Sequence, residues 1–168
     1  MPRTAIPRLG RWPLAALRRR GARSDAVWIH AAIGQAVQLN HQGEREAARL
    51  EFEAIGDEIG GEQGDPLHVC TLAHAMADAR DDLREELLWD LRALSAADLL
   101  TDARMTQAGV GLPAGGLYPS LHLNLSECYR KLGDLGRARE HFERAEATVG
   151  ALGDDEYGRA ATRSVLIR

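Results

Sequence analysis

Lysine, aromatic residues and cysteine are all scarce in this sequence. Lys131 is the single lysine among 21 basic residues, and aromatic side chains make up 5 % of the chain. Arginine in place of lysine, with many alanines and glycines, is typical of a GC-rich genome, so we expect a bacterial protein. Cys70 and Cys128 lie within apolar stretches, which indicates two free, buried thiols in a reducing compartment and not a disulfide framework.

Long apolar runs are also absent. No stretch of about 18 residues is apolar throughout, so the sequence predicts no membrane-spanning helix. The run "WPLAAL" is too short for the apolar region of a signal peptide, and arginines follow it closely. We therefore expect a cytoplasmic protein, with an organelle transit peptide as the alternative interpretation of the Arg-rich beginning.

Acidic residues are missing from residues 1–24, which contain seven arginines. Residues 25–168 then hold 14 basic and 25 acidic residues, a net charge of −11, although the whole chain carries −4. Because phosphate contacts come from clustered Lys and Arg, this acidic body argues against a nucleic-acid surface. Residues 1–24 are interpreted as a basic, disordered arm that could at most touch an anionic partner.

Alanine and leucine at helical spacing are what the sequence has in quantity. Apolar residues recur every three to four positions, and no segment alternates with period two for long enough to form a strand. We predict an all-α fold with an irregular stretch at 101–116. The expected helices lie at about 25–40, 44–59, 66–79, 82–100, 119–132, 134–152 and 155–168.

One pattern of apolar, small and glycine residues occurs twice, 90 residues apart. The later copy consists of Leu125, Ser126, Tyr129, Gly133, Ala138 and Phe142, and the earlier one of Ala36, Leu39, Gly43, Ala48, Phe52 and Ile55. Small residues at these intervals let two antiparallel helices approach, and the glycine permits the chain to reverse. A degenerate copy lies between them around Leu72 and Met76, with Arg80 in place of the glycine.

This pattern resembles the tetratricopeptide repeat (TPR) family over about residues 27–150. The resemblance implies a short right-handed α-solenoid of antiparallel helical hairpins, with repeats at about 27–59, 66–100 and 118–150 and a capping helix at about 155–168. The middle copy departs from the family at Arg80 and at Glu85, where a small residue belongs. An ordinary helical bundle with the same contacts is the alternative.

In this family the first helix of each repeat lines a groove that holds a peptide or a helix of another protein. The resemblance places eleven residues there: His30, Ile33, Val37, Asn40, His74, Asp78, Leu123, Asn124, Glu127, Arg130 and Lys131. Ile33 and Val37 stand where relatives that bind a terminal carboxylate carry Lys and Asn, so no carboxylate clamp is expected. The implied function is non-catalytic protein–protein interaction. The alternative is a regulatory sensor whose packing responds to a bound peptide or small effector.

Signatures of catalysis or of a cofactor are lacking. His68 and His74 do not have metal-ligand spacing, and "GVGLPAGG" at 109–116 lacks the Gly-Lys-Ser/Thr of a phosphate loop. The acids at 81–86 are expected to decorate a helix N-terminus. We therefore expect no catalytic residue, no metal and no cofactor. The apolar end "SVLIR" suggests that the last helix packs against a second copy of the chain.

Overall fold

The computed structural model describes residues 25–150, and these contain seven α-helices, two short 3-10 helices and no strand. The helices are α1 (Asp25–His41), α2 (Arg45–Glu58), η1 (Gly61–Gln63), α3 (Pro66–Asp78), α4 (Leu83–Ala97), α5 (Asp102–Gln107), η2 (Ala114–Leu117), α6 (Tyr118–Lys131) and α7 (Leu135–Gly150). The predicted all-α fold is confirmed for this part of the chain. The basic arm at 1–24 and the capping helix at 155–168 lie outside the described residues.

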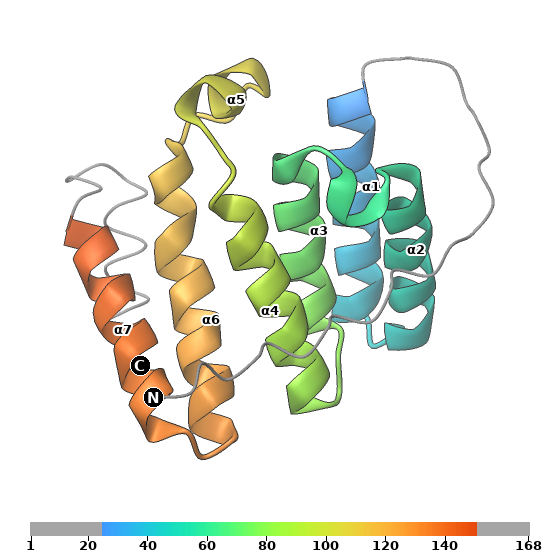
Figure 1. The fold of residues 1–168 in the computed structure, drawn as a ribbon. Helices are drawn as coiled ribbons and strands as arrows, with labels where there is room; N and C mark the ends of the chain where they lie inside the picture. The colour runs from blue at the N-terminus through green and yellow to red at the C-terminus, as the bar shows by residue number, and fades with distance from the viewer. Residues whose placement is uncertain (1–24, 151–168) are drawn as a thin grey trace.

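Six of these helices pair into three hairpins. α1 packs against α2, α3 against α4, and α6 against α7, while α4 also packs against α6. Figure 1 shows the hairpins side by side in chain order, running from α1 and α2 on the right to α7 on the left. The three helix pairs span residues 25–58, 66–97 and 118–150, and the sequence pattern predicted repeats at about 27–59, 66–100 and 118–150.

Two hairpins reverse at a glycine in the left-handed region. Gly43 has a φ of 87° and Gly133 a φ of 82°. At the first turn the N–H of Glu44 donates to the carbonyl of Leu39 at 2.9 Å, and at the second the N–H of Asp134 donates to that of Tyr129 at 2.9 Å. Such hydrogen bonds satisfy carbonyls that a helix end leaves free. The two sequence copies therefore share a turn geometry as well as a spacing.

The turn between α3 and α4 contains no left-handed residue. Arg80 occupies the position that the pattern gives to glycine, and no non-glycine residue among those described has a positive φ. α4 is instead capped by Asp82, whose Oδ1 accepts the N–H groups of Arg84 and Glu85 at 2.8 and 3.1 Å. This N-cap confirms that the acids at this position decorate a helix N-terminus.

Two arginines of α2 hold the end of α3. Arg49 Nε donates to the carbonyl of Ala79 at 2.9 Å, and Arg45 Nη2 donates to that of Asp78 at 3.1 Å. Both guanidinium groups also form ion pairs with Asp81. We call Arg45 and Arg49 the arginine clamp. It satisfies carbonyls at a helix end that lacks a glycine cap, and it joins the first hairpin to the second.

The expectation of an irregular stretch at 101–116 is wrong for its two ends, where α5 and η2 form. Thr101 caps α5 by accepting the N–H of Arg104 at 3.2 Å. Arg104 in turn donates from Nε to Asp65 Oδ2 at 2.7 Å, and Met105 is buried against Leu67. The helix is short, and it depends on these contacts with the start of α3. Seven α-helices are present in residues 25–150 because α5 adds to the six hairpin helices.

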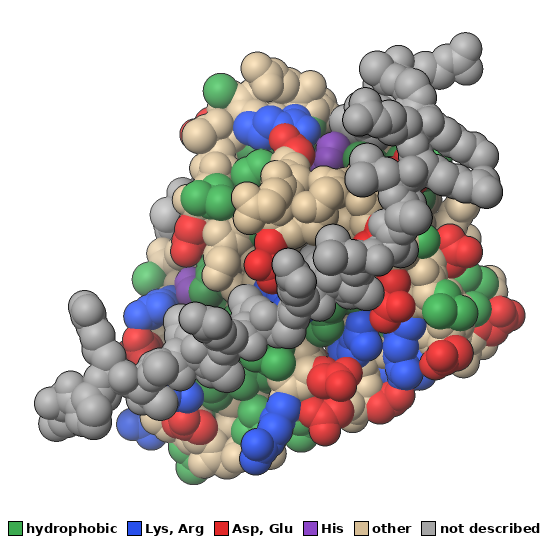
Figure 2. Space-filling model, turned by 45° about the vertical axis from the view of Figure 1, so that its right-hand side comes forward, with side chains coloured by type: hydrophobic (Ala, Val, Ile, Leu, Met, Phe, Trp, Pro, Cys, Tyr) green, Lys and Arg blue, Asp and Glu red, His purple; other side chains and the backbone are tan. Residues whose placement is uncertain are grey.

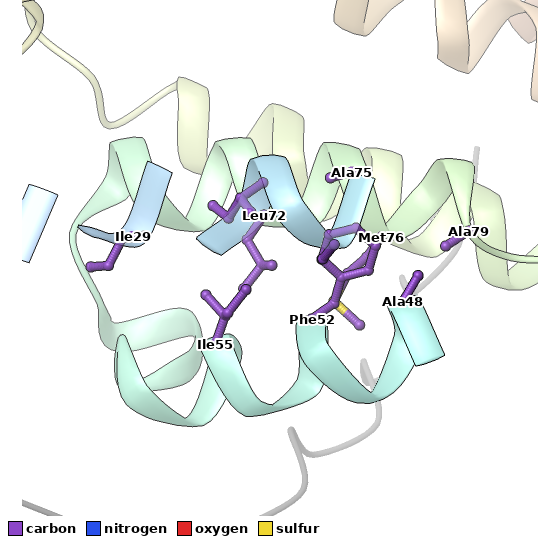
Figure 3. Close-up of a cluster of buried hydrophobic side chains, with 10 residues drawn as sticks. Ile29, Ala48, Phe52, Ile55, Leu72, Ala75, Met76 and Ala79 are labelled. Atoms are coloured by element: carbon purple, nitrogen blue, oxygen red, sulfur yellow. The ribbon is translucent and has the colours of Figure 1, made fainter. Parts of the chain in front are cut away.

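The first core cluster lies between α1, α2 and α3. Figure 3 shows Phe52 and Ile55 of α2 pointing toward Leu72 and Met76 of α3. Phe52 and Leu72 are fully buried. Burial of each large apolar side chain stabilises the fold by about 1.5–3 kcal/mol. The phenylalanine of the earlier sequence copy therefore joins its own hairpin to the next one.

The later copy packs in two clusters. Tyr129 lies with Leu125 and Ala138 against leucines of α4, whereas Phe142 packs against Leu123. Ser126 Oγ donates to the carbonyl of Ala138 at 2.8 Å, so the small residues do bring α6 and α7 close together. Tyr129 thus connects the last hairpin to the middle one.

The sequence also predicted two free, buried thiols and no membrane-spanning helix. Cys70 and Cys128 are both free and buried, as the sequence predicts. Among residues 25–150, no helix combines the length and the apolar character needed to cross a membrane.

Candidate functional site

Two of the eleven predicted groove residues belong to the core. Ile33 is 4 % exposed and packs with Ala36 and Phe52, and Leu123 is 6 % exposed and packs against Ala145. Sequence spacing alone does not say which apolar face of α1 or α6 turns inward. In this structure the neighbouring second helices cover both side chains, so neither is available to a partner, and we correct the expectation at these positions.

The other nine residues keep exposed surface on α1, α3 and α6. Asp78, Arg130 and Lys131 are exposed, and the half-buried members are His30, Val37, Asn40, His74, Asn124 and Glu127. The structure links some of them directly. Asn40 Nδ2 donates to the carbonyl of Asp78 at 3.4 Å, and Arg130 Nε donates to Glu127 Oε2 at 2.7 Å.

A buried carboxylate that the sequence pattern did not single out lies beside one of these predicted residues, His74. Asp90 of α4 is 1 % exposed. Its Oδ1 lies 3.8 Å from Nδ1 of His74 on α3, and its Oδ2 lies 3.5 Å from Sγ of Cys128 on α6. Asp90 therefore stands where the middle and last hairpins meet.

Glu86 extends this group by one helical turn. The Cys128 thiol donates to Glu86 Oε1 at 3.2 Å, and Nζ of Lys131 lies 3.8 Å from the same oxygen. We call His74, Glu86, Asp90 and Cys128 the Asp90 cluster. It brings polar groups of α3, α4 and α6 together, with Lys131 at its edge.

The protonation states of the cluster follow from its surroundings. The Asp90 carboxylate raises the pKa of His74 above its ordinary value, and this effect outweighs the opposing effect of burial. Burial raises the pKa of the Cys128 thiol, and the neighbouring Glu86 and Asp90 raise it further. Cys128 is thus held as a thiol and is not set up as a nucleophile, which would need a lowered pKa.

One signal in the sequence could have pointed to this cluster. Asp90 interrupts the leucines of α4 that pack against α6, and Glu86 precedes it by one turn, so both carboxylates lie on one face of the helix. Cys128 gives no such signal, because it is 38 residues from Asp90 in the sequence. Only the packing of α6 on α4 places them together.

A second buried polar pair joins α6 to α7. His122 and His141 are buried, and their Nδ1 atoms lie 3.0 Å apart, so one ring donates and the other accepts. Burial lowers the pKa of His122 to about 4, and burial also lowers that of His141. Tyr118 stacks on His122 and Tyr129 on His141. The arrangement favours two neutral imidazoles.

The surface and the loop at 109–113 add little specific chemistry. Figure 2 shows basic and acidic side chains next to each other on the face displayed, without a field of one sign. The hollow beside the loop, about 530 Å³, is lined by Asp102, Thr106 and residues 109–113, and none of these is basic. The lining therefore offers no cationic side chain to a phosphate group.

Comparison with protein-family models, with curated proteins and with solved structures finds no match.

Proposed function

We propose that this chain is a TPR-like protein–protein interaction module. In this proposal the three hairpins form a short right-handed α-solenoid, and α1, α3 and α6 offer their common face to a peptide or helix of another protein. The proposed role is non-catalytic. We propose a cytoplasmic location, which the free, buried thiols of Cys70 and Cys128 support.

One observation carries the proposal: the last two turns of α1, α3 and α6 combine buried apolar residues with polar residues that keep exposed surface. Ala36, Met76 and Leu125 face the core, while Asn40, His74, Asp78, Glu127, Arg130 and Lys131 keep exposed surface. Polar groups aligned across neighbouring helices suit the recognition of a peptide, because each helix can contribute a contact. The repeated turns at Gly43 and Gly133 support a common orientation of the first and last hairpins.

The test uses charge reversal on this face and a matched reversal elsewhere. The face variant is Asp78→Arg with Arg130→Glu, and the control variant is Glu51→Arg with Arg139→Glu on α2 and α7. All four positions are exposed, and each variant leaves the net charge unchanged. Circular dichroism and a denaturation curve establish that both variants fold like the unmodified chain.

Each protein is then used as bait, and retained proteins are identified by mass spectrometry. We expect the unmodified chain and the control variant to retain the same partner protein. The face variant should retain at least about tenfold less of it, because placing like charges opposite each other in an interface costs several kcal/mol. Equal retention by all three baits would show that this face is not the binding surface.

The Asp90 cluster favours a regulatory sensor as the second candidate. A small effector or peptide that contacts His74 or Lys131 would act on polar groups shared by α3, α4 and α6. Binding there would change how the hairpins pack. An effector-dependent change in the radius of gyration, measured by small-angle scattering, distinguishes a sensor from a passive scaffold.

A further inference from the structure

We propose that Glu86, Asp90 and Cys128 bind a divalent transition-metal ion of the zinc type, with His74 as a positioning residue. The inference goes beyond the interaction role proposed above and does not depend on it. It also departs from the sequence-based expectation of no metal.

The distances within the cluster fit a tetrahedral ion. One ligand atom from each of the three residues lies within 4.8 Å of the other two. Sγ of Cys128 is 3.2 Å from Glu86 Oε1 and 3.5 Å from Asp90 Oδ2. A zinc ion with bonds of about 2.3 Å to sulfur and about 2.0 Å to oxygen sets these atoms about 3.5 Å apart. The two distances from the sulfur therefore match those around a zinc ion, and the two carboxylate oxygens, within 4.8 Å of each other, would move closer together on binding.

The buried carboxylate is the second, independent observation. The Asp90 side chain is 1 % exposed, and its Oδ1 has no hydrogen-bond partner within the described part of the chain. Oδ2 accepts only from a thiol, at the long distance of 3.5 Å. A buried carboxylate normally has stronger partners, because removing the charge from water is costly. His74 and Lys131, each 3.8 Å from one of the carboxylates, compensate in part. A dication together with Lys131 would balance the charges of Glu86, Asp90 and the Cys128 thiolate.

The donor set selects the kind of metal. A thiolate with two carboxylates suits zinc, whereas magnesium and calcium take oxygen ligands alone. On binding, the S–H bond of Cys128 breaks, its proton leaves to solvent and a sulfur–metal bond forms without electron transfer. Three protein ligands leave a fourth position for water or for a group of a partner.

His74 holds the carboxylate and does not itself ligate. Its Nδ1 lies 3.8 Å from Oδ1 of Asp90, whereas the Cys128 thiol lies beside Oδ2. Residues that hold a ligand in place typically change metal affinity by about 10- to 100-fold when they are replaced. We expect the same range for His74→Gln.

The test is titration of the full-length, reduced protein with cobalt(II), which replaces zinc in such sites and reports a bound thiolate by its charge-transfer absorption. We expect this absorption to appear with a single equivalent of cobalt and to vanish when zinc is added. Cys128→Ser should abolish it. Cys70→Ser is the matched control, since Cys70 is the other free, buried cysteine, and it should leave the absorption unchanged.

Two further variants keep the test decisive if Cys128→Ser folds poorly. Asp90→Asn preserves shape and should weaken cobalt binding by about 100-fold or more, because a ligand contributes at least as much as its outer-shell partner. His74→Gln should weaken binding while the spectrum at saturation stays the same, which a merely structural role would not produce. No thiolate absorption with excess cobalt, or an absorption lost in Cys70→Ser and kept in Asp90→Asn, would overturn the proposal. Capture of a partner does not depend on either result.

Discussion

At the scale of single residues, the buried pair His122 and His141 links the stability of the fold to pH, because burial lowers the pKa of both rings. His122 and His141 share one hydrogen bond within a site closed by Tyr118 and Tyr129. Protonation of both rings would place two cations side by side in a buried site. Arg144 lowers the pKa of both rings further, and Asp98 opposes this at His122 only weakly. The folded protein therefore resists protonation here.

We predict that this pair makes the fold less stable in mild acid. The pKa of His122 falls from 6.5 to about 4 on folding. Between these two pH values the unfolded chain binds more protons than the folded one, so the free energy of unfolding falls as the pH is lowered. Urea denaturation at pH 7 and at pH 5 measures the loss. It should be smaller in the double variant His122→Gln/His141→Gln and unchanged in His41→Gln, an exposed position. Equal losses in all three proteins would contradict the assignment.

At the scale of elements, helix ends depend on a few local residues. Asp65 caps α3 by accepting the N–H of Leu67 at 3.1 Å, immediately before Pro66. Gly43 and Gly133 end α1 and α6 in the left-handed region. These signals are local, so the sequence predicts the six hairpin helices. α5 is different, because it depends on burial of Met105 in a cluster that only the fold assembles.

The turn after α6 gives a prediction with an internal control. Gly133→Ala should destabilise the protein by about 1–2 kcal/mol, because alanine is strained at a φ of 82° although no atom lies within 4 Å of the added methyl group. Gly136→Ala, three residues later, lies in the first turn of α7 at an ordinary φ and should stabilise by up to about 1 kcal/mol, because alanine has fewer conformations to lose on folding. Urea denaturation measures both. A shift of the same sign in the two variants would rule out the conformational explanation.

At the scale of the whole molecule, the hairpins are held together by contacts between residues that are far apart in the sequence. The arginine clamp joins the first hairpin to the second, and Tyr129 with the leucines of α4 joins the second to the third. Arg49 and Arg139 occupy equivalent positions in the two sequence copies, yet Arg139 is exposed on the last hairpin, which no further described hairpin follows. Equivalent residues therefore differ in energetic role.

This difference predicts unequal effects of the same substitution. Arg49→Met keeps the apolar stem but removes the hydrogen bond to Ala79 and the ion pair with Asp81, so we expect a loss of about 1–2 kcal/mol. Arg139→Met should change stability by no more than about 0.5 kcal/mol. Thermal and urea denaturation compare the variants. Similar losses would mean that the clamp does not couple the first two hairpins.

The sequence by itself determined the helical class, the three hairpins and the two glycine turns, because these depend on periodicity and on residues close together in the chain. It could not decide that Ile33 and Leu123 face the core, since several faces of these helices are apolar. Nor could it show that His74 and Cys128 join Asp90 and Glu86, because these residues come from three helices. Only the packing of α6 on α4 brings Cys128 to Asp90, because distances between distant residues follow from tertiary structure and not from local pattern.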